Sequence, residues 1–187
     1  MNIPSLRTSR LLLRGWTDAD REAFAALNAD PDVMHHFPAA LSRAESDALV
    51  DTIQERWVTN GWGLWATEVR DGGPLDGRFI GFIGLNPAPA EYPCAPATEI
   101  GWRLASFAWG HGYATEGALR VVEFAFEEAG LDELVSFTTF KNERSQAVMR
   151  RIGMTRDPDG DFVSTRVPAD WPERFSVLYR LRAPSTT

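Results

Sequence analysis

The chain has 187 residues, of which 44% are hydrophobic and 24% charged, so it is about one domain long and has enough apolar side chains for a core. Its formal net charge of −7 argues against a nucleic-acid partner, because phosphate binding needs a basic face. A single cysteine, Cys94, excludes an intramolecular disulfide framework and a thiolate zinc cluster, and the lack of a membrane-spanning apolar run or a signal-peptide layout predicts a soluble, cytoplasmic protein without a membrane partner.

The first sixty residues predict one strand and two helices. Residues 6–16 alternate basic and apolar positions before a leucine run, which favours a strand. The pair Thr17-Asp18 then offers an N-cap for a helix that runs to Asn28. After a loop or short turn bracketed by prolines, Ser42 opens a second helix with a capping box, and Asn60-Gly61 ends it.

Three strands follow, at residues 64–69, 79–85 and 98–104. The turn Asp71-Gly72-Gly73-Pro74 separates the first two, and a loop rich in proline and alanine, residues 87–96, separates the second from the third. Each segment is short and rich in apolar residues, as is typical of buried strands.

The C-terminal part alternates helices and strands. The longest helical pattern covers Ala114 to Ala129 and stops at Gly130; a strand at 134–140, a helix at 142–152 and a last strand at 175–181 come after it. No linker or internal repeat interrupts this order, which predicts a single mixed α/β domain over residues 1–187 with a frayed tail at 182–187.

The segment Trp109-Gly110-His111-Gly112-Tyr113-Ala114-Thr115-Glu116 lies between a strand and the longest helix. Its glycines let the backbone approach a ligand, and the helix start offers unpaired amides to phosphate oxygens. The nucleotide P-loop would need a lysine where Ala118 stands, and the dinucleotide fingerprint would need a glycine where Thr115 stands. Two readings remain for this segment, a phosphate-binding loop and a tight turn.

A second motif, Asn142-Glu143-Arg144-Ser145, ends a strand and begins a helix. Asn142 is a good N-cap, and the hydroxyl of Ser145 at the third helical position lies near the same end. On its own the motif is compatible with a helix cap and nothing more.

Together these motifs resemble the GNAT superfamily of N-acetyltransferases, in particular its branch of ribosomal-protein serine/alanine N-acetyltransferases. The likeness extends over nearly the whole chain, with the Trp109–Glu116 segment as its most specific element. Its other elements are Leu11-Leu12-Leu13-Arg14, Ile80 to Leu85, Glu99-Ile100-Gly101-Trp102 and Asn142-x-x-Ser145-x-x-Val148 with Gly153-Met154. The superfamily's loop usually begins with Arg or Gln; Trp109 stands there instead, a departure that the branch shares.

The resemblance implies an α+β fold of the GNAT type: a strongly twisted mixed sheet of six to seven strands flanked by about four helices. Two central strands, 98–104 and 134–140, would splay apart to admit acyl-CoA. The resemblance also implies the residues that bind acetyl-CoA. They are the β-strand backbone of Ile100, Gly101, Trp102 and Arg103, the loop residues Trp109, Gly110, His111, Gly112, Tyr113, Ala114 and Thr115, and the side chains of Asn142 and Ser145.

The implied reaction is direct attack of a neutral amine on the acetyl thioester. At pH 7.5 an α-amine, with a pKa near 7.7–8.0, loses its proton at a cost under about 1 kcal/mol, whereas a lysine pays about 4 kcal/mol. Glu99 is the candidate base, and a purely structural carboxylate is the alternative for it. Many superfamily members donate a proton to the leaving thiolate from a tyrosine where Met149 stands, so Ser145 becomes the candidate that stabilises the sulfur.

The resemblance places His35, His36 and Phe37 at the border of the acceptor site. Trp65, with other tryptophans, is either a core residue or part of an acceptor cavity. Adjacent histidines cannot easily face one metal from an ordered strand, so we expect no metal.

The sequence therefore predicts an acetyl-CoA-dependent N-acetyltransferase whose acceptor is a protein N-terminal α-amine. A small amine, such as an amino acid, polyamine or drug, is the alternative acceptor, and a non-catalytic acyl-CoA-binding module is the alternative class. A homodimer is compatible with the sequence.

Overall fold

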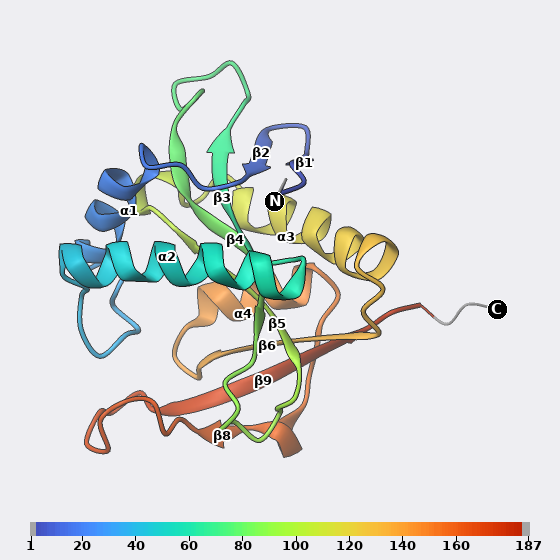
Figure 1. The fold of residues 1–187 in the computed structure, drawn as a ribbon. Helices are drawn as coiled ribbons and strands as arrows, with labels where there is room; N and C mark the ends of the chain where they lie inside the picture. Colours follow the sequence, from blue (N-terminus) through green and yellow to red (C-terminus); the bar gives the residue numbers. More distant parts are fainter. Residues whose placement is uncertain (1–2, 185–187) are drawn as a thin grey trace.

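The computed structural model describes residues 3–184, and one mixed β-sheet runs through them (Figure 1). The strand order is β1-β2-β3-β4-β5-β6-β9-β7, and β8 also pairs with β9. The bounds are Leu6–Arg7 (β1), Leu11–Arg14 (β2), Leu64–Val69 (β3), Phe79–Pro87 (β4), Thr98–Leu104 (β5), Glu133–Thr139 (β6), Thr155–Arg156 (β7), Phe162–Val163 (β8) and Phe175–Arg182 (β9). Of the 9 strands, β1, β7 and β8 have 2 residues each, so the six longer strands agree with the predicted six to seven.

Helices cover both faces of the sheet. They are α1 (Asp20–Ala29), α2 (Arg43–Asn60), α3 (Tyr113–Glu123) and α4 (Glu143–Arg151), with a π-helical turn at Phe124–Glu128 and 3-10 turns at Ser106–Ala108 and Pro158–Gly160. In Figure 1, α2 crosses in front of the sheet and α3 lies behind it. Helix α1 packs on α2, and α4 packs on α3. This arrangement confirms the α+β fold implied by the resemblance.

The two central strands diverge after one contact. Strand β5 pairs with β4 along all of Thr98–Leu104, but its parallel pairing with β6 is confined to Glu99 and Val135. From Ile100 onward, β5 has no strand partner on its β6 side among the described residues. The predicted splay is thus present, and it leaves half of the backbone groups of this stretch without a ladder partner.

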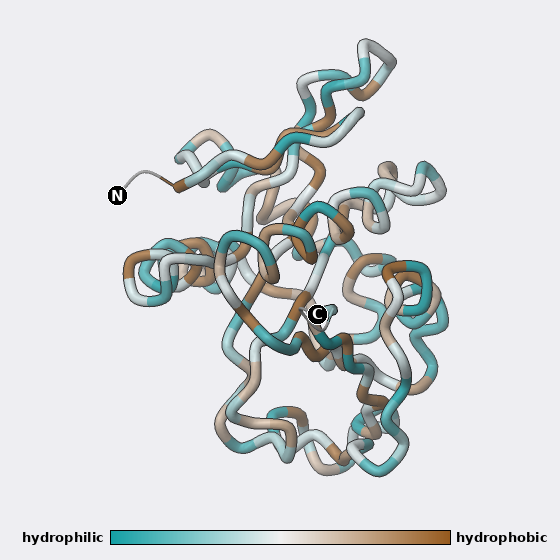
Figure 2. Tube along the Cα trace, turned by 90° about the vertical axis from the view of Figure 1, so that its right-hand side faces the viewer, coloured by the Kyte–Doolittle hydropathy of each residue, from teal (hydrophilic) through white to brown (hydrophobic). Residues whose placement is uncertain are grey.

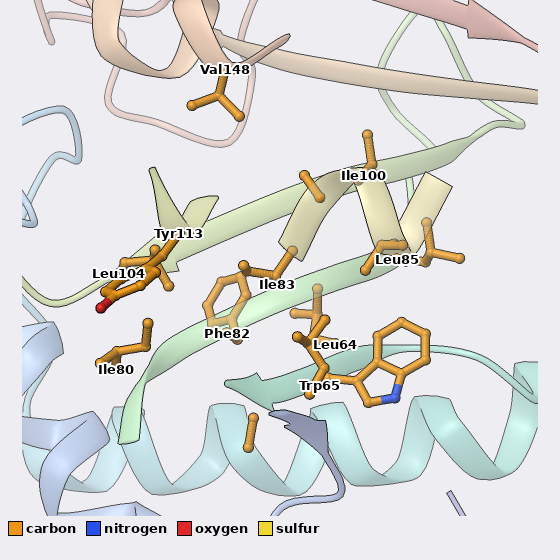
Figure 3. Close-up of a cluster of buried hydrophobic side chains, with 14 of the residues drawn as sticks. Leu64, Trp65, Ile80, Phe82, Ile83, Leu85, Ile100, Leu104, Tyr113 and Val148 are labelled. Carbon is orange, nitrogen blue, oxygen red and sulfur yellow. The ribbon is translucent and has the colours of Figure 1, made fainter. Parts of the chain in front are cut away.

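Buried side chains of the sheet and of all four helices form one core cluster. Figure 3 shows Ile83 and Leu85 on β4 and Ile100 on β5 in one buried cluster, with Val148 reaching toward them from α4. Helix α3 approaches the sheet closely because Gly117 has no side chain: a Cβ there would lie 2.4 Å from Cδ1 of Ile83. The loop between β3 and β4 projects away from this core and is largely hydrophilic (Figure 2).

Helix α2 begins and ends as predicted. The Ser42 hydroxyl accepts from the Glu45 amide at 3.3 Å, and the Glu45 carboxylate accepts from the Ser42 amide at 2.8 Å, which completes the capping box. Gly61 ends the helix with φ at 74°, the left-handed conformation that glycine adopts most easily.

The N-cap predicted at Thr17-Asp18 is wrong, because α1 begins at Asp20. Asp20 is 3% exposed and accepts from the Thr17 amide and from two nitrogens of Arg14, each at 2.8 Å. The Asp20 carboxylate, which binds Arg14 and the Thr17 amide, therefore takes the place of the N-cap that we expected at Thr17-Asp18. Burial alone would raise the pKa of Asp20, but the hydrogen bonds from Arg14 and Thr17 outweigh this effect and lower the pKa.

The two ends of the chain also differ from prediction. Residues 6–16 form a hairpin rather than one strand, because a turn after Arg7 brings Leu6 opposite Leu13 and buries both. Arg182 belongs to β9, and the Ala183 amide donates to the Asp132 carbonyl at 2.8 Å. A frayed tail beginning at 182 is therefore wrong, and residues 185–187 of that prediction lie outside the described residues.

Candidate functional site

The segment before α3 presents its backbone amides to solvent. Gly110 and Gly112 have φ values of 81° and 80°, which side chains with a Cβ adopt only with strain. Among the described residues, none of the amides of residues 110–115 donates a hydrogen bond to the protein. Those at the start of α3 have no carbonyl four residues back within the helix. Unpaired amides at a helix N-terminus suit phosphate oxygens, so the geometry fits the phosphate-binding reading.

Two side-chain hydrogen bonds hold this loop in place. Trp109 Nε1 donates to the Leu104 carbonyl at 2.9 Å, and the Tyr113 hydroxyl donates to Asp71 at 2.7 Å. That hydroxyl keeps the pKa of the Asp71 carboxyl below its usual value. Because Trp109 and Tyr113 are used in this way, the loop would meet a ligand through its backbone. The ring of His111 is exposed and stacks on Tyr113, with the ring centroids 5.2 Å apart.

Glu116, in the first turn of α3, binds the β1–β2 turn. Its carboxylate accepts from the Thr8 hydroxyl at 2.6 Å and from the Arg10 amide at 2.9 Å, and it pairs with the Arg10 guanidinium at 2.6 Å. Partial burial works to raise the pKa of Glu116, but Thr8 and Arg10 outweigh it and the pKa is lowered. Glu116 therefore anchors the helix rather than a ligand.

Two arginines that the sequence did not point to flank the loop. Nη2 of Arg10 would be 3.6 Å from a Cβ placed on Gly112, and the Arg144 guanidinium lies 4.7 Å from the centroid of the Trp109 ring. Arg144 belongs to the second motif, so its position could have been a signal. Arg10 lies about a hundred positions away from the loop in the chain, and no local pattern connects it to the loop. Both cations are placed to interact with an anion on the loop.

Strand β5 presents different features on its edge and on its two faces. Ile100 and Leu104 point into the core beside α3 (Figure 3). Since side chains alternate along a strand, Glu99, Gly101 and Arg103 point to the opposite side, toward α1 and α2. A Cβ on Gly101 would meet only the Glu99 carboxyl, at 3.6 Å, within a 4 Å radius. The space above Gly101, between Glu99 and Arg103, is therefore open.

The second motif has the predicted cap geometry. Asn142 Oδ1 accepts from the Ser145 amide at 3.1 Å, and Asn142 Nδ2 donates to the Thr138 hydroxyl at 3.1 Å. Each amide atom of Asn142 retains one further hydrogen-bonding position for a ligand. The Ser145 hydroxyl is half-buried and has no hydrogen-bond partner among the described residues.

No tyrosine takes the place of Met149, which is 1% exposed in the core. The three tyrosine hydroxyls already have partners: Tyr92 pairs with Ser164, Tyr113 donates to Asp71, and Tyr179 donates to Gln146 of α4. Ser145, in the first turn of α4, is therefore the hydroxyl of the motif that is free to contact a ligand.

Among the carboxyl groups of the described residues, Glu99 has the pKa that is raised furthest. Its side chain is half-buried, next to Asn86 on β4 and near Arg56 of α2. Burial raises the pKa of Glu99 to about 8, although Arg56 and Asn86 work to lower it. A carboxyl that titrates near neutral pH beside an open space can accept a proton from a weakly basic amine.

The predicted acceptor-side residues lie on the loop between α1 and α2. His36 Nδ1 is 2.8 Å from Glu173 of the loop before β9, and Lys141 Nζ is 3.6 Å from the same carboxylate. The exposed His35 ring lies against His36, with ring centroids 4.8 Å apart. Phe37 is 40% exposed. The pairing of His36 with Glu173 thus connects the α1–α2 loop to the loop before β9.

His35, His36 and Glu173 each place one possible ligand atom within 4.8 Å of the others. His35 and His36 lie in a turn and not in the ordered strand for which we expected that adjacent histidines would face apart, so their ring nitrogens can approach one point. The spacing alone does not indicate a metal, since Lys141 already neutralises the shared carboxylate.

Trp65 does not lie in the acceptor region. It is 0% exposed, packs edge-on against Trp57 and Phe124, and donates from Nε1 to the Pro4 carbonyl at 2.7 Å. The predicted substrate contact at Trp65 is therefore wrong. Its place on a fully buried central strand, β3, makes it a core residue.

Known proteins are similar to this chain over most of its length. The family described as an acetyltransferase (GNAT) domain matches residues 10–155. The FsC-acetyl coenzyme A-N(2)-transacetylase of Aspergillus fumigatus is 36% identical over 163 residues, which cover 81% of this chain. The chain spans 65% of the length of that relative.

Solved structures show the same fold. An acetyltransferase from Agrobacterium tumefaciens str. C58 superposes with a TM-score of 0.77 at 32% identity, over 98% of this chain and 96% of that one. A proposed ribosomal-protein-serine acetyltransferase from Vibrio cholerae has a TM-score of 0.75 at 18% identity, over 98% of this chain and 100% of that one. The second likeness concerns the fold alone. Among the described residues, no helix has the length and apolar character needed to cross a membrane.

Proposed function

The chain belongs to the acetyltransferase (GNAT) domain family, and from this premise we propose that it transfers an acetyl group from acetyl-CoA to the N-terminal α-amine of a protein or peptide. The observation that carries this choice of acceptor is Glu99, whose carboxyl has a pKa of about 8 and faces the open space above Gly101. An α-amine has a pKa of about 7.7–8.0, so the base and the acceptor are matched.

Acetyl-CoA would be held by two backbone features. The unpaired amides of residues 110–115 would bind its phosphates, and the free β5 edge at Ile100–Arg103 would pair with its amide-containing arm. Asn142 would add a hydrogen bond to the same arm from its remaining positions. Bound in this way, the cosubstrate supplies an activated acetyl thioester.

The reaction removes one proton from the amine nitrogen and expels the CoA thiolate, which is protonated from water after it leaves. The amine nitrogen forms the new bond to the acetyl carbon while the carbon–sulfur bond breaks, so a proton must leave nitrogen and the thiolate must be stabilised. Glu99 would accept the proton, directly or through water. Ser145 would donate a hydrogen bond to the departing sulfur, since its hydroxyl has no other partner among the described residues.

A small-molecule amine is the second candidate acceptor. It is favoured by the 36% identity to a transacetylase whose name specifies an N(2) position of FsC. Either acceptor would pass the α1–α2 loop with His35, His36 and Phe37, of which Phe37 lies against the Arg103 guanidinium and His36 pairs with Glu173. A module that binds acyl-CoA without catalysis would leave the raised pKa of Glu99 without a use.

Cofactor binding is tested with a pair of glycine variants. Gly110 and Gly61 both have positive φ, 81° and 74°, and a Cβ on either would meet nothing within 4 Å. Gly110→Ala and Gly61→Ala should therefore lose similar stability through backbone strain. We expect calorimetric titration to show acetyl-CoA binding weakened at least tenfold in Gly110→Ala and unchanged in Gly61→Ala. Equal affinities in the two variants would place the phosphates elsewhere.

The acceptor is tested by following thiol release from acetyl-CoA with peptides, free amino acids and polyamines. Acceleration by peptides with a free N-terminus, abolished by blocking that amine, supports the proposal. Acceleration by small amines alone would select the second candidate. Acetyl-CoA binding with no acceleration by any amine would indicate the non-catalytic module.

A further inference from the structure

Arg103 is a cation without a carboxylate partner. The chain has 26 acidic residues against 19 lysines and arginines, yet among the described residues no Asp or Glu forms an ion pair with Arg103. Its Nη1 instead donates to Asn28 Oδ1 at 2.6 Å. The guanidinium also lies over the ring of Phe37, 4.4 Å from its centroid. Neutral groups therefore surround this charge.

The donors that remain free form one edge of the guanidinium. Nη1 is used by Asn28, whereas Nε is buried and has no hydrogen-bond partner, and no hydrogen bond from Nη2 to a described residue is present. Nε and Nη2 are the pair whose parallel N–H bonds match the two oxygens of a carboxylate. Asn28 is fixed in turn, since it is 0% exposed and donates to Ser46 at 2.9 Å.

The environment makes this edge a strong anion site. Burial lowers the pKa of Arg103 to about 10, so the side chain remains charged at neutral pH while poorly solvated. A buried charge without a counterion is costly, and an anion that reaches it meets little screening by water. Phe37 of the α1–α2 loop is 40% exposed and lies against the guanidinium, so a ligand that binds Arg103 would contact or displace this ring.

Arg103 shares a strand face with the candidate base. It lies four residues from Glu99 on β5, or about 13 Å along the strand, and the space above Gly101 between them is open. Resting on the proposed function, we propose that Arg103 is the specificity residue of the acceptor site and binds a carboxylate carried by the acceptor amine. The acceptor is then a carboxylate-bearing amine, either a free amino acid or a peptide with an acidic group near its N-terminus.

The test compares acceptors that differ only in charge. Serine is paired with serinamide, and a peptide beginning Ser-Asp is paired with one beginning Ser-Asn. In the wild type we expect kcat/KM for the charged member of at least one pair to exceed that for its neutral partner tenfold or more, mainly through KM. The amino-acid pair and the peptide pair distinguish the two sources of the carboxylate.

Two substitutions complete the experiment. Arg103→Met should reduce the charged-to-neutral ratio to about one. Because both acceptors react with the same bound acetyl-CoA, this ratio is independent of any change in cosubstrate binding along the β5 backbone. Arg78→Met is the matched control, because Arg78 also lies over an aromatic ring, that of Phe107 at 4.1 Å, but is exposed and lies before β4. We expect this control to keep the wild-type ratio. Arg103→Met removes a buried unpaired charge but also the donor to the buried Asn28 Oδ1, so its melting temperature is measured to confirm that the variant is folded.

Each contrary result has a distinct meaning. Equal ratios in wild type and Arg103→Met, or a parallel loss with charged and neutral acceptors, would overturn the inference and leave Arg103 as a tether for the Phe37 loop. A chain that binds acetyl-CoA but acetylates none of the amines would refute the proposed function itself. In that case, the binding of N-acetylserine against N-acetylserinamide by calorimetry, in the presence of CoA, still tests the carboxylate site.

Discussion

At the scale of single residues, Ser145 supplies a free hydroxyl where Met149 cannot donate a proton. We expect Ser145→Ala to lower kcat more than tenfold while acetyl-CoA affinity stays nearly unchanged, because the lost hydrogen bond acts on the leaving sulfur rather than on the bound cosubstrate. Steady-state kinetics and calorimetric titration measure the two quantities. An unchanged kcat would remove Ser145 from the mechanism.

The same scale shows which roles a sequence can indicate. The cap at Asn142 and the left-handed glycines Gly110 and Gly112 were predictable, because a few neighbouring residues determine them. The burial of Trp65 and the isolation of Arg103 depend on side chains distant in sequence, such as Phe124 and Asn28. No local pattern reports such contacts, so the sequence left the first open and missed the second.

At the scale of elements, the free edge of β5 is the feature that distinguishes the central strands. Its residues Ile100–Arg103 pair with β4 but not with β6. We expect saturating acetyl-CoA to slow amide hydrogen exchange in peptides that cover 100–103 and 110–115, because the cosubstrate would occupy the unpaired amides of both. Mass spectrometry measures this, with β9 as the internal control. Slowing confined to 110–115 would mean that the arm does not lie along β5.

Helices and strands that are determined by residues close in sequence were predicted with the correct bounds. Strands β3 and β5 have the predicted bounds, and α2 has both of its predicted ends. The start of the first helix was predicted wrongly because Asp20 accepts hydrogen bonds from Arg14. The first strand was predicted wrongly because Leu6 is buried opposite Leu13 in a hairpin. In both cases a tertiary contact outweighed a local signal.

At the scale of the whole molecule, Glu99 links stability to pH. Its pKa is about 8 when folded and 4.5 as an ordinary carboxyl, so the folded state holds this proton more tightly. The resulting stabilisation is complete below pH 4.5 and is lost as the pH rises toward 8, at a rate of at most about 1.4 kcal/mol per pH unit. Carboxyls with a lowered pKa, such as Asp20, titrate below this window.

Urea unfolding of wild type and Glu99→Gln at pH 5, 6, 7 and 8 tests this effect. Glutamine cannot ionise, so the free energy of unfolding of the variant should rise steadily relative to that of the wild type as the pH increases. Taking the difference between the two proteins cancels the contribution of every other titrating group that the substitution leaves unchanged. A difference that is constant with pH would show that the Glu99 carboxyl is ionised throughout.

Strand β5 also has a consequence for the order of events in catalysis. One side of its backbone is proposed to hold the acetyl donor, and the face with Glu99, Gly101 and Arg103 is proposed to receive the acceptor. Since an edge and a face of one strand can be occupied at the same time, neither molecule has to depart before the other arrives. A ternary complex then follows from the geometry, and no side chain of the protein has to carry the acetyl group between two half-reactions.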